Sequence, residues 1–281
     1  MPFVGAEAVP AHRYDVIVVG SGAGGGQMAY TLTMEGARVL LLEAGRKYDP
    51  ATETAMFQTP EMAPLRGSAT PDKPRGFYDA TVGGGWQVPG EPYLGAGEEG
   101  EPFRWWRARM LGGRTNHWGR VALRNGPYDF KPRSRDGLGF DWPISYEDLA
   151  PYYDKVELLV GIYGSNEGLE NTPDSPEGCL LPPPRPIVSD LLIRKHGATL
   201  GLPTIPCHRA VLTQALDHRN NPPRLHPGNA FAQGIVARDM QRRSPCFWAT
   251  PCGQGCSIRA NYQSTTVHLP PALETGKLDI V

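Results

Sequence analysis

The sequence contains no hydrophobic run long enough to cross a membrane. None of its apolar stretches approaches the roughly 20 residues that a transmembrane helix needs. Residues 1–15 lack a charged start followed by an apolar core, so no secretory signal peptide is predicted. The pair Arg242-Arg243 lies too far along the chain to be a twin-arginine signal. We therefore expect a cytoplasmic protein without a membrane span, and export alongside a partner subunit remains an open alternative.

The sequence also has no excess of charge of one sign and no even set of cysteines that would indicate disulfide bonds. The formal net charge is −1, and no block of like charge is long enough for a nucleic-acid arm, so nucleic acid is not an expected partner. Five cysteines in 281 residues are an odd count in a large chain, which argues against a disulfide framework. The chain has no internal repeat, nucleophile elbow, Walker loop or zinc-protease helix motif, so hydrolase and nucleoside-triphosphatase hypotheses lack support.

The first recognisable unit is a strand, a helix and a second strand. Residues 14–20 form an apolar, β-branched run that ends in glycine, which is typical of a buried parallel strand. Residues 24–36 carry apolar side chains at helical spacing, and Gly36 is a plausible stop. Residues 38–43 predict a second buried strand. The three pieces form a βαβ unit.

A dinucleotide fingerprint lies at the turn between the first strand and the helix. Gly20, Gly22 and Gly25 satisfy the G-x-G-x-x-G pattern. The first glycine makes the tight turn, the second lets the backbone approach a pyrophosphate, and the third lets the helix pack on the strand. The phosphates then lie at the N-terminus of the helix, where N–H groups and the helix dipole favour negative charge.

The acid that follows the second strand narrows the choice of cofactor. Glu43 lies 18 residues after Gly25, at the distance expected for a carboxylate that binds ribose hydroxyls. A carboxylate there would repel the 2′-phosphate of NADP, and Arg46 alone does not offset it. FAD and NAD remain. The expected cofactor-binding residues of this unit are Gly20, Ser21, Gly22, Gly24, Gly25, Glu43, Ala44 and Gly45.

The rest of the chain shows further helices between long irregular segments. Helices are predicted over residues 146–161, 190–201 and 265–273, and irregular chain over residues 47–103, 173–186 and 203–256. Ser145 and Asp148 form an imperfect capping box for the first of these helices. Residues 277–281 predict the start of a strand. A strand is an odd place for a native chain to end, so we expect a fragment of a longer protein.

Four later segments carry a family resemblance. Residues 110–118, with the sequence MLGGRTNHW, resemble the second glycine motif of the glucose-methanol-choline (GMC) flavoprotein oxidoreductases. Within that family the similarity is greatest to the sugar-oxidising branch, which includes pyranose oxidases and the large subunits of gluconate and glucose dehydrogenases. Residues 140–153, 252–256 and 264–266 are similar to further segments of that branch. The resemblance spans roughly residues 14–281.

The resemblance implies a fold and its division into domains. The fold class is α/β, with a Rossmann-type FAD/NAD(P)-binding domain and an incomplete α+β substrate domain. Residues 10–130 would form the first segment of the FAD-binding domain and residues 131–245 part of the substrate domain. Residues 246–281 would return to the FAD-binding domain.

The resemblance also implies a flavin site. FAD would lie across the βαβ unit, and N–H groups of residues 113–116 would tune the isoalloxazine ring. In pyranose oxidases a histidine in a similar Thr-His-Trp setting carries the flavin covalently, but here Asn116 separates Thr115 from His117. Flavin contact by His117, covalent attachment and a plain buried hydrogen bond stay open. The additional cofactor-binding residues are Gly112, Gly113, Thr115, Asn116, His117 and Trp118.

The clustered cysteines Cys246, Cys252 and Cys256 are considered as iron–sulfur ligands, because some glucose dehydrogenases of this branch carry a three-iron cluster in a comparable region. The short C-x-x-C spacing is absent, and a zinc site would need a fourth ligand, for which Cys207 and His208 are only guesses. We favour free thiols packed in a loop, and expect no metal.

The implied activity is oxidation of an alcohol, such as a sugar or polyol hydroxyl, by hydride transfer to flavin N5. In the family the base is a histidine near the C-terminal end of a longer chain, so we expect it beyond residue 281 and name no catalytic residue. The electron acceptor and the oligomeric state stay unknown. The alternatives are a flavin-less relic, an assembly subunit, or an NAD-dependent dehydrogenase, which should lack the segments 112–118 and 141–153.

Overall fold

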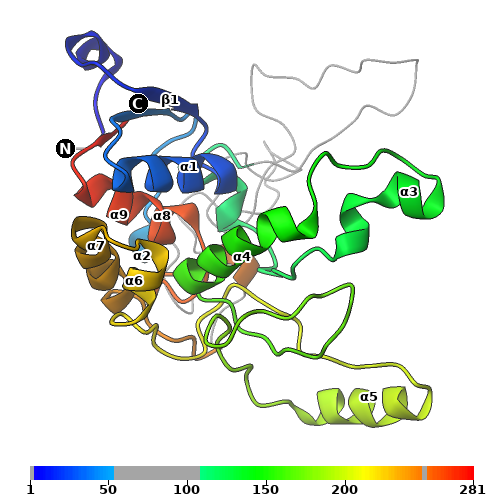
Figure 1. Ribbon diagram of the computed structural model, residues 1–281. Helices are drawn as coiled ribbons and strands as arrows, with labels where there is room; N and C mark the ends of the chain where they lie inside the picture. The colour runs from blue at the N-terminus through cyan, green and yellow to red at the C-terminus, as the bar shows by residue number, and fades with distance from the viewer. Residues whose placement is uncertain (1–2, 54–107, 249–251) are drawn as a thin grey trace, which may run out of the picture.

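A computed structural model describes residues 3–53, 108–248 and 252–281. The predicted loops over residues 47–103 lie mostly outside these residues. No helix among the described residues is both long and apolar enough to span a membrane. The two ends of the described chain lie close together, beside the same small sheet (Figure 1).

The sheet joins the two ends of the chain. Strands β1 (Val16–Val19) and β2 (Val39–Leu42) flank helix α1 (Ala23–Met34), and β3 (Leu278–Ile280) pairs with β2. The order is β1-β2-β3 and both pairings are parallel. Gly36 ends the α1 segment with φ +96°, a conformation that glycine adopts without strain. The βαβ unit, the stop at Gly36 and the strand at residues 277–281 are therefore confirmed.

The prediction that β1 is buried is wrong. Val18 is 8% exposed and lies against the start of α1, whereas Ile17 is 61% exposed and Val19 80%. Successive side chains of a strand point to opposite faces of the sheet, and β1 is an edge strand in the described structure. The central strand β2 has three of its four residues buried, as predicted.

The other elements of the described residues are helices, joined by long irregular segments. In order they are η1 (Ala6–Ala11), α2 (Pro50–Glu53), η3 (Gly113–Asn116), η4 (Pro127–Phe130), α3 (Pro132–Asp136), α4 (Tyr146–Val160), α5 (Val188–Thr199), α6 (Asn221–Leu225), α7 (Ala230–Gln241), η5 (Cys252–Gln254), α8 (Ser264–Val267) and α9 (Leu269–Glu274). Helices α4 and α5, and α8 with α9, match the three predicted helical segments. Residues 131–245 contain α3 to α7 and isolated β-bridges such as Tyr163 with Arg209.

The prediction of irregular chain over residues 203–256 is wrong, because α6 and α7 lie within it. Asn229 caps α7 by accepting a hydrogen bond from the N–H of Ala232 at 3.0 Å. The helix buries Ile235, Val236 and Met240 at helical spacing. The prolines of α6 and the glycines around the start of α7 obscured this pattern in the sequence.

The capping box of α4 is complete. The Ser145 hydroxyl accepts a hydrogen bond from the Asp148 N–H at 3.3 Å, and the Asp148 carboxylate accepts one from the Ser145 N–H at 2.8 Å. Gly161, with φ +78°, ends the helix. The box thus fixes where α4 begins, and the glycine fixes where it stops.

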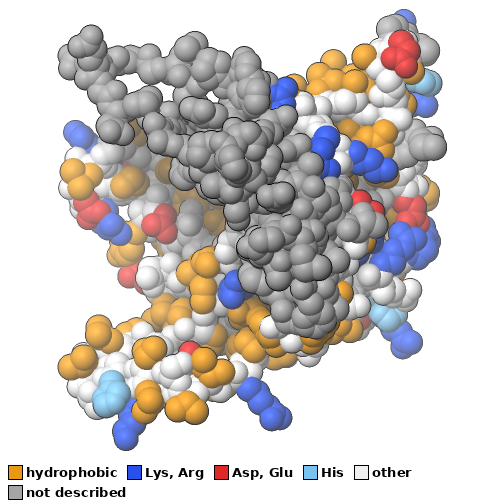
Figure 2. All heavy atoms as spheres, turned by 180° about the vertical axis from the view of Figure 1, so that it is seen from behind, with side chains coloured by type: hydrophobic (Ala, Val, Ile, Leu, Met, Phe, Trp, Pro, Cys, Tyr) orange, Lys and Arg blue, Asp and Glu red, His pale blue; other side chains and the backbone are white. Residues whose placement is uncertain are grey.

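One apolar core connects the sheet to the helices around it. It includes Met34 from α1, Leu159 from α4, Ile235 from α7 and Ala272 from α9. Helix α5 lies outside this core and projects from the body of the molecule (Figure 1). From behind, hydrophobic side chains cover this projection (Figure 2).

Candidate functional site

The first glycine motif forms a tight turn against the start of α1. Gly20 has φ +87°, which favours glycine. A Cβ on Gly25 would lie 1.8 Å from the carbonyl oxygen of Gly20 and 3.2 Å from Val18 Cγ1. Only glycine lets α1 approach β1 this closely. The geometry agrees with the turn and packing roles that the sequence suggested for these two glycines.

The start of α1 is not covered by side chains of the described residues. A Cβ on Gly22 or Gly24 would meet no heavy atom of the described residues within 4 Å. The first turn of α1 carries no acidic side chain. The first N–H groups of a helix have no partner within the helix, and its dipole favours negative charge there. This end of α1 is therefore suited to an anionic ligand such as a pyrophosphate.

Glu43 holds the glycine turn through hydrogen bonds. One carboxylate oxygen accepts hydrogen bonds from the N–H (3.0 Å) and the hydroxyl of Ser21. The other accepts one from the N–H of Gly45 at 2.8 Å. A carboxylate has about four acceptor sites, so one position remains for a further donor. The hydrogen bonds between Ser21 and Glu43 were not predicted from the sequence.

The second glycine motif lies directly on the first. The N–H of Gly112 donates to the Ser21 hydroxyl oxygen at 2.7 Å, across 91 residues of sequence. A Cβ on Gly113 would lie 3.9 Å from the Cα of Gly22. A Cβ on Gly45 would lie 2.2 Å from the N atom of Met110, so the chain after β2 also needs a glycine here. Ser21 thus connects both motifs with Glu43.

A third segment, residues 262–268, completes this arrangement. The Thr115 hydroxyl donates to the Gly112 carbonyl at 2.6 Å and accepts from the N–H of Ser264 at 3.0 Å. A Cβ on Gly26 would lie 2.0 Å from the Ser264 hydroxyl oxygen. Ser264 was not predicted as a site residue. The similarity of residues 264–266 to the family motif was the available signal.

The turn that ends the second motif is partly closed by its own hydrogen bonds. The N–H of Gly113 donates to the Met110 carbonyl at 2.8 Å, and that of Thr115 to Gly112 at 3.2 Å. Two of the N–H groups expected to face a flavin are therefore engaged within the loop. His117 is buried at the end of this turn.

A buried arginine anchors the end of this loop. Arg120 donates to the carbonyls of Trp118 (2.7 Å) and Asn116 (3.2 Å), and its guanidinium lies 5.4 Å from the centre of the Trp118 ring. Burial lowers the pKa of Arg120 to about 10. Trp118 donates from Nε1 to the Tyr262 carbonyl at 3.4 Å. This role of Arg120 was not predicted from the sequence.

The clustered cysteines are not gathered into a compact group of ligand atoms in the described residues. Cys246, Cys252 and Cys256 are free thiols, and they are not among the groups whose ligand atoms lie within 4.8 Å of one another. Cys246 Sγ accepts a hydrogen bond from the Trp248 N–H at 3.2 Å, and burial raises the pKa of the Cys246 thiol.

One group of potential ligands does occur, but an arginine holds it. Asp154, Glu157 and Cys179 bring their ligand atoms within 4.8 Å of one another. Arg124 donates to the Asp154 carboxylate at 2.6 Å and to the two Glu157 oxygens at 2.6 and 2.7 Å. This network fastens the chain after the second motif to α4. A guanidinium already supplies the positive charge that a metal would bring.

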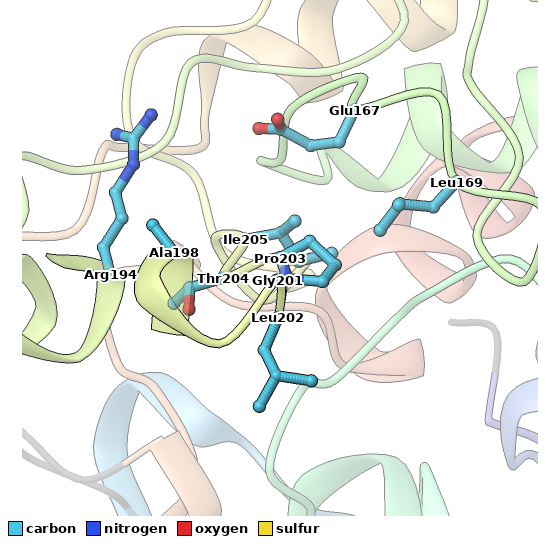
Figure 3. A pocket seen from close by; sticks show the side chains of 9 residues that line it. All are labelled: Glu167, Leu169, Arg194, Ala198, Gly201, Leu202, Pro203, Thr204 and Ile205. Atoms are coloured by element: carbon cyan, nitrogen blue, oxygen red, sulfur yellow. The ribbon is translucent and has the colours of Figure 1, made fainter. Parts of the chain in front are cut away.

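A separate open pocket of about 380 Å³ lies at the C-terminal end of α5. Figure 3 shows Arg194 of α5 and Glu167 at different sides of it, around a floor formed by the chain after the helix. None of its lining residues belongs to the two glycine motifs.

No protein-family model matches the chain, but known proteins do. It is 28% identical to 2-methyl-1,2-propanediol dehydrogenase of Mycolicibacterium austroafricanum, over 95% of this chain and 45% of that protein. It is 30% identical to paromamine 6′-oxidase of Streptomyces fradiae, over 72% of this chain and 34% of that protein. It is 33% identical to the fructose dehydrogenase large subunit of Gluconobacter japonicus, over 58% of this chain and 29% of that protein. The chain spans less than half the length of these relatives.

Proposed function

From its relationship to oxidoreductases of the GMC type, we infer that this chain forms part of an FAD-dependent enzyme that oxidises an alcohol. Its role in that enzyme is to hold the ADP half of FAD and to place a loop beside the isoalloxazine ring. The substrate class is a small alcohol, such as a sugar or polyol.

One observation carries this proposal. Ser21 joins three segments that are far apart in the sequence, because it bonds both to Glu43 and to Gly112. Beside this junction, the positions of a Cβ on Gly22 and Gly24 stay clear of the described residues. Because Gly22 and Gly24 carry no side chain, a pyrophosphate could approach the N–H groups at this helix N-terminus closely.

The residues present suit the parts of FAD. The N-terminus of α1 would bind the pyrophosphate, and the unused acceptor position of Glu43 would bind ribose. The loop of residues 112–118 would lie at the isoalloxazine ring, with His117 and Trp118 as its contacts. Acid precipitation distinguishes a covalent link between His117 and the flavin from simple contact. When bound, FAD would accept the hydride from the alcohol carbon.

The pairing of β3 with β2 supports the proposed domain division. Residues 10–130 and 246–281 would then share one FAD-binding domain, and residues 131–245 would begin the substrate domain. The alcohol proton needs a base, and we assign this role to no described residue. The electron acceptor would be oxygen, a quinone or a partner subunit.

The test is the visible spectrum of the protein, expressed as its source reading frame encodes it. Flavin absorption that is retained on gel filtration would support the proposal. Acid precipitation then separates the two attachment modes: colour in the supernatant means non-covalent FAD, and colour in the pellet means a covalent link that His117→Ala should abolish.

A matched pair of variants ties the colour to the glycine site. Gly22→Val fills the space above α1 and should yield folded, colourless protein. Gly234→Ala, on α7, should keep the flavin, because its Cβ would only meet the flexible end of Arg238 at 3.5 Å. A colourless wild-type protein that binds NAD instead would contradict the flavin assignment and favour a nicotinamide enzyme.

A further inference from the structure

A continuous row of aromatic rings runs from the proposed flavin loop to the surface. The ring centres of Trp118 and Tyr262 are 5.9 Å apart, and those of Tyr262 and His268 are 5.2 Å apart. On the other side of His268, Tyr30 is 5.9 Å away, and His226 lies 5.6 Å from Tyr30. We call these five residues the Tyr–His row. It joins the end of the loop to α8, α1 and the end of α6 (Figure 1).

Each tyrosine of the row has a histidine as hydrogen-bond partner. The Tyr30 hydroxyl lies 2.6 Å from His226 Nε2, and the Tyr262 hydroxyl lies 3.3 Å from His268 Nδ1. All four side chains are buried. Packing alone needs aromatic rings in these places, but it does not need two tyrosines that are each paired with an imidazole.

The protonation states suit oxidation of the phenols. Burial lowers the pKa of His268 to about 3 and also lowers that of His226, so both imidazoles are neutral and can accept a proton. Burial raises the pKa of Tyr30 and of Tyr262, so both phenols keep their protons. A phenol that loses an electron becomes a far stronger acid than an imidazolium, and its proton then passes to the neighbouring nitrogen.

The outer end of the row reaches a small surface cavity. His226 and Tyr30 line a hollow of about 80 Å³ together with Gln27, Glu35 and Lys155. The exposed carboxylate of Glu35 lies 3.9 Å from His226 Nδ1, where it would stabilise an imidazolium. A small reductant in solution could therefore act close to this end of the row.

We propose that the Tyr–His row carries one-electron oxidising equivalents from the flavin site to the surface, where a small reductant removes them. The proposal rests on the proposed function, because that places the flavin beside Trp118. The row would protect the site when a strong one-electron oxidant, such as a radical derived from peroxide, forms there. Oxidation of the alcohol by hydride transfer does not use the Tyr–His row, because the reduced flavin that this reaction forms does not need an oxidised tyrosine.

The electrons and protons balance at each step. The oxidant takes one electron from the Trp118 indole, which takes one from Tyr262, and the Tyr262 proton moves to His268. Tyr262 then takes one electron from Tyr30 and recovers its proton from His268, while the Tyr30 proton moves to His226. Finally a thiol or ascorbate at the surface gives one electron to Tyr30, which recovers its proton from His226. The net result is one electron passed from the reductant to the oxidant.

The test traps the radicals and identifies them by electron paramagnetic resonance. The flavin-loaded protein is illuminated with blue light beside an irreversible electron acceptor and frozen. A second sample without flavin is oxidised with azide radicals, which attack indoles in preference to phenols. Both samples are prepared for wild type, Trp118→Phe, Tyr30→Phe and the double variant Tyr30→Phe/Tyr262→Phe. Tyr152→Phe is the control, because Tyr152 is largely exposed and lies outside the row.

The expected signal is a phenoxyl radical in wild type and in the Tyr152→Phe control. It should fall to less than half in Trp118→Phe and in the double variant, and it should move to Tyr262 in Tyr30→Phe. An unchanged signal in the double variant, with wild-type melting temperature, would overturn the proposal. If only the azide sample shows these effects, the row conducts but the flavin placement is wrong, which separates this inference from the proposed function.

Discussion

Helices α1 and α5 each have 12 residues, but they differ in what surrounds them. Helix α1 buries five residues, among them Tyr30 and Met34, against the sheet, α8 and α9. Helix α5 buries none of its residues in the described structure, although Leu191, Leu192 and Ile193 are about half exposed and apolar. Short helices are marginal in water without packing. Stability and the proposed cofactor site thus belong to the α1 region, whereas α5 depends on its local sequence.

The largest expected effect compares one buried and one exposed apolar residue. Met34→Ala should lower the free energy of unfolding by about 2–5 kcal/mol, because Met34 is 2% exposed and its loss leaves a cavity. Leu192→Ala on α5 should change it by less than about 0.5 kcal/mol. Chemical denaturation followed by circular dichroism measures both. Equal losses would show that α5 is packed in solution, contrary to its exposure in the structure.

Two neighbouring glycines of α1 should respond in opposite ways. Gly25→Ala places a Cβ 1.8 Å from the Gly20 carbonyl and should cost about 3 kcal/mol, with loss of FAD binding. Gly24→Ala meets no described atom and should leave the fold intact or stabilise it by about 0.4–1 kcal/mol, because alanine favours a helix. It should nevertheless weaken FAD binding. Calorimetric titration and melting curves separate the two effects, and tight FAD binding by Gly25→Ala would contradict the packing argument.

The α1 side of the molecule also contains a buried acid, on α7. Burial raises the pKa of Asp239 to about 6, and nearby arginines offset this only in part. A raised folded-state pKa means that stability is fully present below the unfolded value near 3.8 and is lost as the pH rises to about 6.

The expected loss over this range is on the order of 2 kcal/mol. Asp239→Asn should remove this slope and stabilise the protein at neutral pH. The free energy of unfolding of both proteins, measured at pH 4, 5, 6 and 7, tests this pH dependence. A slope that persists in the variant would assign the pH dependence to another group.

The smallest expected losses of stability come from substitutions at the N-termini of helices. Ser145→Ala removes the cap of α4 and should cost about 1 kcal/mol. In α5 the Asp190 carboxylate accepts from the Ile187 N–H at 3.0 Å, so Asp190→Ala should cost roughly 0.5 kcal/mol. Hydrogen exchange should show faster opening of α5 in this variant while α1 stays protected. Equal protection of α1 and α5 in wild type would contradict the contrast between them.

Local patterns carried most of the predictable structure. The glycine spacing, the two strands of the βαβ unit, the stop at Gly36 and the cap at Ser145 each depend on neighbours within a few residues. They were therefore visible in the sequence. Helix α7 was missed because prolines and glycines flank it, although Asn229 was a usable capping signal. The burial of β1 was mistaken because an apolar run does not reveal whether a strand lies at an edge.

The contacts that assemble the candidate site could not be predicted from the sequence. Ser21 meets Gly112 across 91 residues, and Thr115 meets Ser264 across 149. No local pattern encodes such pairs. The family resemblance named the segments that take part, but not the hydroxyl groups that join them. Arg120 lies two residues beyond the second glycine motif, and only its burial among the carbonyls of the loop shows what it anchors.

The most direct test of the account is an FAD titration of the protein, expressed as its reading frame encodes it, beside Glu43→Gln and Gly22→Val. We expect tight FAD binding by wild type, a clear loss of affinity in Glu43→Gln and no measurable binding in Gly22→Val, with all three proteins folded. Equal FAD affinity in wild type and Gly22→Val would contradict it, because the space above α1 would then not be where the cofactor lies.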